Sequence, residues 1–203
     1  MLFRSRDFIA NISHELKTPI GALSLLSEAI AQAQDEPVAM EKFATRIKIE
    51  AKRLEELVKE IINLSRLQGD DPLTDPHPVD ISEVVATAID QAETSAEVRR
   101  INVERVDTSS CWVMGDREQL IMAVHNLIEN AINYSPEGTR VSVEVKELAG
   151  LVQVAVVDQG IGIKDEDLER IFERFYRVDP ARSRETGGTG LGLSIVKHVA
   201  QNH

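Results

Sequence analysis

The chain opens with two long segments in which apolar residues recur every three or four positions. This spacing predicts two amphipathic helices of about seven turns each. The first stripe contains Phe8, Ile12, Leu16, Ile20, Leu23, Leu26 and Ile30, and the second contains Met40, Phe43, Ile47, Ala51, Leu54, Val58, Ile61 and Leu64. The short connection through Pro37 predicts an antiparallel hairpin. One hairpin cannot cover both stripes, so we expect two copies to form a dimeric four-helix bundle through residues 1–70.

A polar, proline-rich break from Gly69 to Pro78 predicts a domain boundary, with one domain over residues 1–70 and another over 71–203. The second domain mixes both kinds of pattern, which predicts an α+β fold with helices on one face of a sheet. The helical segments are 81–96, 116–134 and 191–200; the strand-like segments are 101–106, 112–114, 141–145 and 151–157. Residues 159–190 are charged and glycine-rich, and they predict a loop with a helical piece.

The composition excludes several classes of protein. A net charge of −11 without a basic stripe argues against a nucleic-acid partner. The single cysteine, Cys111, rules out an intramolecular disulfide and fits a reducing compartment. No apolar run approaches the roughly 18 residues that indicate a membrane span. We therefore expect a soluble, intracellular chain, with any membrane anchor lying outside it.

His14 lies about 180° from the centre of the first apolar stripe, so it should face solvent. Glu15 is its neighbour, Thr18 follows one turn later near the same meridian, and Pro19 should kink the helix. A lone exposed histidine is usually a plain surface residue. The four features together favour a nucleophile, because neutral imidazole attacks well near pH 7 and a carboxylate strengthens that attack.

The chain has no P-loop motif, so phosphates would have to be held in another way. Asn126 and Asn130 share one face of the helix predicted over 116–134, together with Asn133 or Tyr134. Polar side chains on a packed face are costly unless they meet a ligand, although a surface or capping asparagine is a common alternative. Asn130 could supply a neutral oxygen to Mg²⁺, with phosphates supplying the rest.

Two glycine-rich segments suggest the remainder of a nucleotide site. Asp158 could accept a hydrogen bond from the amine of adenine, and Gly160 and Gly162 would let the backbone approach a planar ligand. Asp-x-Gly is also a common turn. The second segment opens the last predicted helix and would present N–H groups to phosphates, unless it is a flexible linker. It includes Gly187, Gly188, Gly190, Leu191 and Gly192.

In order and spacing, these segments resemble the sensor histidine kinases over residues 8–202. Residues 8–19 resemble the H-box. The helix predicted over 116–134 resembles the N box. The Asp158 segment resembles the G1 box, and the second glycine-rich segment resembles the G2 box. Phe172 and Phe175 resemble the F-box of the ATP lid. Within that family, the sequence most resembles the phosphate-regulon type of actinobacteria.

The resemblance implies a Bergerat-type sandwich that binds ATP and Mg²⁺. His14 would be the phosphoacceptor, Glu15 its general base, and Thr18 would position water for dephosphorylation of a response regulator. Arg177, rather than Arg174, would touch the γ-phosphate. The partners would be a second copy and a receiver domain, and the full-length protein would sit in the bacterial inner membrane with this part in the cytoplasm. Asn133 replaces a basic residue common in the family, so no phosphate role is assigned to it.

Other classes share parts of this pattern. The Hsp90, gyrase and MutL ATPases resemble residues 116–192 only, and they carry a glutamate where this chain has Asn126. An anti-sigma serine kinase would lack the H-box hairpin. A third possibility is a non-catalytic dimerisation scaffold, against which the intact motif residues argue.

The family has two more strands after the last helix, whereas this sequence stops at Asn202 and His203. This predicts a truncated kinase whose sheet has a free edge and whose last helix is partly uncovered. From that exposure we expect weak or absent ATP binding and a disordered lid, with a hairpin that still dimerises.

Overall fold

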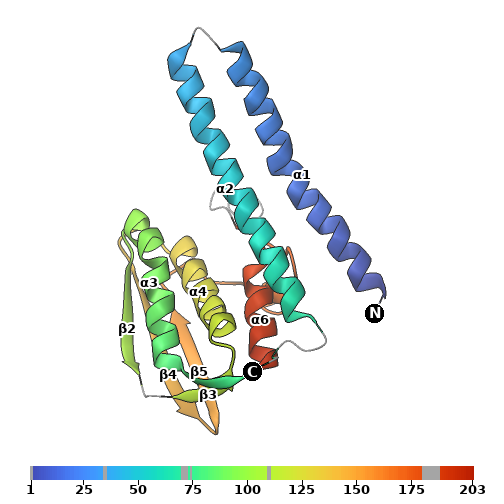
Figure 1. The fold of residues 1–203 in the computed structure, drawn as a ribbon. Coiled ribbons are helices and arrows are strands. Elements are labelled where there is room, and N and C mark those ends of the chain that lie inside the picture. The colour runs from blue at the N-terminus through green and yellow to red at the C-terminus, as the bar shows by residue number, and fades with distance from the viewer. Residues whose placement is uncertain (1, 34–35, 70–72, 74, 109–110, 180–187) are drawn as a thin grey trace. The chain divides into compact units, whose positions relative to one another are not determined.

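The computed structural model describes residues 2–33, 36–69, 73, 75–108, 111–179 and 188–203 (Figure 1). The chain forms two compact units: one contains residues 1–63 and 179–189, and the other contains residues 64–178 and 190–203. The division therefore falls inside the second helix. Whether the functional domains divide at residue 70 stays a prediction.

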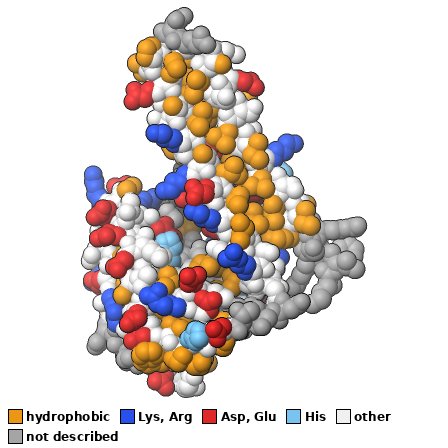
Figure 2. Space-filling view, in the orientation of Figure 1, with side chains coloured by type: hydrophobic (Ala, Val, Ile, Leu, Met, Phe, Trp, Pro, Cys, Tyr) orange, Lys and Arg blue, Asp and Glu red, His pale blue; other side chains and the backbone are white. Residues whose placement is uncertain are grey.

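The first unit is the predicted helical hairpin, built from α1 (Leu2–Gln32) and α2 (Pro37–Leu67). Among the described side chains of these two helices only Pro19, Leu57, Leu64 and Leu67 are buried, and the last two belong to the second unit, so one hairpin has little core of its own. Figure 2 shows hydrophobic side chains gathered along this hairpin. Ile20, which the sequence assigns to the apolar stripe, remains 53% exposed in the single chain. The hairpin thus keeps apolar surface that a partner could cover.

The second unit contains both helices and strands. The helices are α3 (Ile81–Arg99), α4 (Arg117–Tyr134) and α6 (Gly192–Asn202), and the strands are β1 (His77–Asp80), β2 (Asn102–Thr108), β3 (Trp112–Gly115), β4 (Arg140–Leu148) and β5 (Leu151–Val157). β1 pairs with β3 in a two-stranded antiparallel sheet. The main sheet has the order β2-β4-β5, with β2 parallel to β4 and β4 antiparallel to β5.

Side chains at helix and turn boundaries explain where these elements begin and end. Asp80 caps α3 by accepting from the Ser82 N–H, and Asp116 caps α4 in the same way. The β4–β5 turn places Ala149 and Gly150 at φ angles of 53° and 81°. This left-handed backbone is what a tight two-residue hairpin turn requires. The helix predicted from residue 116 therefore starts one residue later, behind its cap.

The core lies between the sheet and the helices α3 and α4, which lie on one side of the sheet (Figure 1). Val141, Val143 and Val145 alternate with polar residues along β4, and all three are buried. Ile128 and Ile132 of α4 are fully buried in the same cluster. The observed arrangement is the α+β sandwich that the sequence predicts, with helices on one face.

The last helix, α6, agrees only in part with the expected exposure. Leu191, Ile195 and Val199 are buried in this chain, whereas Leu193 and Val196 are half-buried. α6 packs against α4, which covers part of its apolar side. Among the described strands, β2 and β5 are the two edges of the main sheet.

Candidate active site

His14 lies on the exposed side of α1, as the sequence predicts. Glu15 beside it is half-buried, and Pro19 is buried inside the helix. The Thr18 hydroxyl lies 3.5 Å from the His14 carbonyl oxygen, a contact too long to hold the hydroxyl firmly. Thr18 is itself exposed. An imidazole ring, a carboxylate and a hydroxyl therefore lie within about one turn of each other.

The helix that resembles the N box is α4, whose buried side anchors it to the sheet. Asn126, Asn130 and Tyr134 are all half-buried on this helix. The Asn126 side-chain amide donates to the Met122 carbonyl oxygen at 2.8 Å, which fixes its orientation. The amide oxygen of Asn126 then points away from the helix backbone and toward the start of α6.

Gly192, the first residue of α6, lies directly against this oxygen. A Cβ built on Gly192 would be 2.6 Å from Asn126 Oδ1, closer than real contacts allow. The structure thus brings the predicted N-box and G2 segments together, although Asn126 and Gly192 lie 66 positions apart in the sequence. A larger residue at position 192 would have to displace the Asn126 side chain.

Asp158 follows the end of β5, and its carboxylate oxygen Oδ1 accepts from the Gly160 N–H at 2.7 Å. A Cβ on Gly160 would lie 2.7 Å from that oxygen and 2.9 Å from the Tyr134 carbonyl oxygen. This turn therefore lies against the end of α4. The contact brings the predicted G1 and N segments together. The motif is thus a turn, and the Asp158 side chain is exposed. Gly162 has a φ of 71°, which favours glycine.

The residues of the glycine loop before α6 differ in burial and in hydrogen bonding. Leu191 is fully buried, and the Ser194 hydroxyl donates to its carbonyl oxygen at 2.7 Å. Gly188 and Gly190 are half-buried, and Gly190 has a φ of 77°. The Phe175 N–H donates to the Gly190 carbonyl oxygen at 2.8 Å. The loop is therefore anchored to the F-box segment rather than being a free linker.

The predicted lid residues are only partly described. Phe172 is exposed and ends the short 3-10 turn η2 (Arg170–Phe172), while Phe175 and Arg177 are half-buried. The described part of this region holds two short helical pieces, η2 and a second 3-10 turn, η1 (Asp165–Asp167). Residues 180–187, including Gly187 and most of the expected disordered lid, lie outside the described residues.

Sequence reasoning missed a cluster formed by Asp167, Arg170 and Tyr176. The Tyr176 hydroxyl donates to Asp167 Oδ1, and the Arg170 guanidinium lies 4.2 Å from the centre of the tyrosine ring. The hydrogen bond to Asp167 is the main cause that raises the pKa of Tyr176, because it favours the protonated phenol. The only sequence signal was an aromatic residue inside a run of charged ones.

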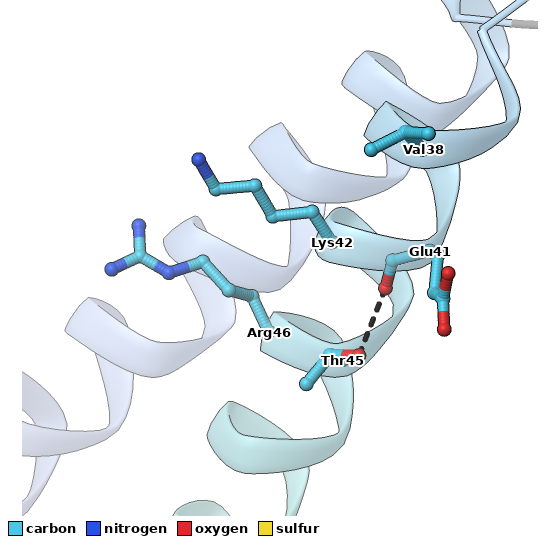
Figure 3. A pocket seen from close by; sticks show the side chains of 5 residues that line it. All are labelled: Val38, Glu41, Lys42, Thr45 and Arg46. Carbon is cyan, nitrogen blue, oxygen red and sulfur yellow. Dashed lines mark hydrogen bonds between the residues drawn. The ribbon is translucent and has the colours of Figure 1, made fainter.

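Two other features bear on ligands. Among the described residues, no group of three or more histidine, cysteine or acidic side chains could hold a metal ion. Asn130 therefore has no protein carboxylate cluster around it, and a cation there would need ligands from elsewhere. A separate shallow pocket lies on α2 and is lined by Val38, Glu41, Lys42, Thr45 and Arg46 (Figure 3). It contains none of the predicted site residues.

These features define a two-part phosphotransfer core: a helical hairpin with an exposed histidine, and a nucleotide domain built from α4, the Asp158 turn and the glycine loop. Family models agree with both parts. The His Kinase A (phospho-acceptor) domain matches residues 4–70, and the histidine kinase-, DNA gyrase B- and HSP90-like ATPase matches residues 115–203. The chain belongs to the sensor histidine kinase family.

Individual relatives agree. The sensor-like histidine kinase SenX3 of Mycolicibacterium smegmatis is 48% identical over 198 residues, which is 98% of this chain and 52% of the relative. The solved mycobacterial sensor histidine kinase MprB is 34% identical, with a TM-score of 0.56 over 64% of this chain and 80% of that one. The resemblance to the phosphate-regulon type and to actinobacterial members is confirmed.

A third comparison concerns the fold alone. The histidine kinase ThkA, solved in complex with the response regulator TrrA, is 24% identical to this chain with a TM-score of 0.70. The match covers 84% of this chain and 50% of that one. The chain spans about half the length of the curated relatives it matches. No helix among the described residues is long and apolar enough to cross a membrane.

Proposed function

We propose that this chain uses ATP to phosphorylate His14 and then passes the phosphoryl group to an aspartate of a response-regulator receiver domain. The observation that carries the proposal is the exposed His14 on a phosphoacceptor hairpin, joined in one chain to an ATPase domain. ThkA, which shares this fold, was solved with a response regulator, and that supports a partner of the same class.

The residues of the nucleotide domain fit ATP. Asp158 offers an exposed carboxylate to the amine of adenine, and the backbone N–H groups at the start of α6 suit phosphate oxygens. Gly188, Gly190, Leu191 and Gly192 would line the phosphate side, with Arg177 near the terminal phosphate. Asn126, Asn130 and Tyr134 would complete the site from α4, and Phe172 and Phe175 would border it.

Magnesium is the cation that we propose for this site. Asn130 would supply a neutral side-chain oxygen, which suits a hard cation that takes its other ligands from phosphates and water. The lack of an acidic or histidine cluster among the described residues fits this arrangement, because the phosphates would carry the negative charge.

His14 has the role of nucleophile. One imidazole nitrogen forms a bond to the terminal phosphorus, the bond to the bridging oxygen breaks, and ADP leaves. Glu15 accepts the proton of the other ring nitrogen and stabilises the positive charge that develops on the ring. A receiver aspartate then displaces the histidine, and Thr18 would position water when the regulator is dephosphorylated. ATP supplies the phosphoryl group.

The hairpin would act as a homodimer through residues 1–70, because its stripes keep exposed apolar side chains. We also infer that this part of the protein works in the cytoplasm, and that the full-length protein is held in the bacterial inner membrane by a segment outside this chain. The net charge of −11 argues against a nucleic-acid partner.

The test is incubation with γ-labelled ATP and magnesium. We expect a protein-bound label that is labile in acid and stable in alkali, and its loss in His14→Gln with nucleotide affinity retained. His77→Gln is a matched control, because His77 is also exposed and lies 3.1 Å from a carboxylate of Asp75. A label that persists in His14→Gln would show that another residue is the acceptor.

A further inference from the structure

Asp167 is unusual among its neighbours. It is 8% exposed, whereas the other nine residues of 161–170 are all exposed. Aspartate is rarely buried unless it is paired, because burial removes the water that stabilises its charge. Its partner is Tyr176, whose hydroxyl donates to Asp167 Oδ1. A hydrogen bond to an ionised acceptor is about twice as strong as one between neutral groups.

Tyr176 is held from a second side as well. The Arg170 guanidinium lies 4.2 Å from the centre of its ring, within the range of a cation–π interaction. The Tyr176 N–H also donates to the Glu173 carbonyl oxygen at 3.3 Å. The side chain and backbone of Tyr176 are thus both fixed to the segment 167–173.

The residue before Tyr176 has a strained backbone. Phe175 has a φ of 63°, a left-handed conformation that bulky side chains seldom adopt. Such conformations persist only where the surroundings enforce them, and they cluster at ligand-binding sites. Here the Phe175 N–H donates to the Gly190 carbonyl oxygen at 2.8 Å.

Gly190 fits tightly against this strained segment. A Cβ on Gly190 would lie 2.9 Å from both the Cα and the carbonyl carbon of Phe175, and 3.1 Å from the Tyr176 carbonyl oxygen. The backbone at residues 175 and 176 is therefore the surface on which the glycine loop rests. Any shift of Tyr176 would be transmitted to Gly190, two residues before α6 begins at Gly192.

We propose that Asp167 is a positioning residue, which acts through Tyr176 to hold the Phe175–Tyr176 backbone against Gly190 and so sets the shape of the phosphate-binding glycine loop. The inference rests on the proposed function, in which this loop binds the phosphates of ATP. Asp167 itself does not touch the nucleotide. Its contribution is to keep the loop in its binding shape before ATP arrives.

The experiment compares four variants by titration with Mg-ATP. Asp167→Ala removes the acceptor, and Tyr176→Phe removes only the donor hydroxyl while keeping the ring over which Arg170 stacks. Each should weaken ATP affinity by about tenfold, the size expected for one charge-assisted hydrogen bond. The double variant should be no weaker than either single one, because both changes remove the same bond. Asp167→Asn keeps an acceptor and should recover part of the affinity.

Glu166→Ala is the matched control. Glu166 is a neighbouring acidic residue on the same turn η1, but its side chain is 74% exposed and lies 3.7 Å from Lys164. We expect wild-type ATP affinity from it. Additive losses in the double variant, or an unchanged affinity in Tyr176→Phe, would overturn the positioning role, since a purely structural effect of the aspartate would not depend on one hydroxyl.

Amide hydrogen exchange without nucleotide separates this inference from the proposed function. The Phe175 N–H should exchange faster in Asp167→Ala and Tyr176→Phe than in the wild type, because its bond to Gly190 loosens. Faster exchange with no ATP binding in any protein would reject ATP as the ligand but keep the positioning role. Unchanged exchange would reject the positioning role whatever the affinity for ATP.

Discussion

The side-chain oxygen of Asn126 occupies the space that a β-carbon on Gly192 would need, 2.6 Å from that position. The two residues belong to different helices, α4 and α6, and the contact fixes how closely the glycine loop approaches the asparagine face. Because the Asn126 amide also donates to the Met122 carbonyl oxygen at 2.8 Å, the side chain cannot move away without losing a hydrogen bond.

Gly192→Ala should therefore impair nucleotide binding more than it impairs folding. Alanine favours the helix by roughly 1 kcal/mol over glycine, which offsets part of the steric cost. The displaced Asn126 would lose its orientation, so we expect ATP affinity to fall by about tenfold or more. Gly21→Ala is the control, because nothing lies within 4 Å of the Cβ it adds. Calorimetric titration and thermal melting, run on both variants, separate the two effects.

Much of the fold could be predicted because the periodic apolar positions of the sequence match the buried positions in the structure. The alternation of Val141, Val143 and Val145 identified β4, and these side chains are buried as expected. His14 could be placed on the outside of α1 from its angle to the stripe alone. These features depend on local pattern, which the sequence records directly.

The parts that could not be predicted depend on contacts between distant segments. The burial of Leu191 and Ile195 comes from packing of α6 on α4, which no local pattern reveals. Asp167 lies in a stretch of charged residues that reads as solvated loop, yet it is buried through its bond to Tyr176. The left-handed backbone of Phe175 is likewise imposed by its tertiary contact with Gly190.

Asp158→Asn should lower ATP affinity with little effect on stability. The amide oxygen of asparagine can still accept from the Gly160 N–H, so the turn should survive. The variant lacks the charge that attracts the adenine amine and repels a guanine carbonyl, so the ratio of ATP to GTP affinity should fall by about tenfold. Asp165→Asn, an exposed carboxylate on η1, serves as the control. A preference for ATP that survives in Asp158→Asn would remove the carboxylate from adenine selection.

Thr18→Ala should reduce dephosphorylation of the response regulator more than autophosphorylation of His14. The Thr18 hydroxyl contacts the His14 carbonyl oxygen only at 3.5 Å, so its loss should leave the helix intact. Thr45→Ala on α2 is a matched control, since its hydroxyl donates to the Glu41 carbonyl oxygen at 2.9 Å (Figure 3). Both activities are measured with labelled phosphate on the same preparations. Equal losses in Thr18→Ala would indicate damage to the hairpin instead of loss of a positioned water.

Acid should weaken the attachment of α6 in a way that depends on His198. Burial lowers the pKa of His198, and the nearby charges of Arg174 and Lys197 lower it further. Because the pKa of His198 is lower in the folded state, its neutral ring contributes stability at pH values above the pKa of the unfolded state, about 6.5. This contribution is lost as the pH falls through the lower pKa of the folded state. The neutral ring can accept from the Gln68 side-chain amide, 3.2 Å away.

His198→Gln cannot titrate in this range. The free energy of unfolding of the wild type, relative to that of this variant, should therefore fall as the pH is lowered from 7 to 5. Chemical denaturation at each pH measures both proteins. A difference that stays constant with pH would mean that His198 has the same pKa in both states.

The exposed apolar side chains of the hairpin lead to the last prediction. Ile20 belongs to the stripe that the sequence assigns to the bundle interior, yet it is 53% exposed in a single chain. Leu25 is 68% exposed, but it lies on the His14 side of α1 when positions advance by about 100° per residue. If a second hairpin covers the stripe, Ile20 becomes buried in the dimer whereas Leu25 does not.

Ile20→Asn should then weaken the dimer, and Leu25→Asn should not. Full burial of an isoleucine side chain is worth about 1.5–3 kcal/mol, of which roughly half remains to be gained at Ile20 in each chain. Because each dimer would contain two copies of the substitution, its dissociation constant should rise by at least about tenfold. Sedimentation equilibrium over a range of protein concentrations measures both variants against the wild type. A dimer weakened by Leu25→Asn and not by Ile20→Asn would place the interface on the histidine side, where it would compete with the response regulator for access to His14.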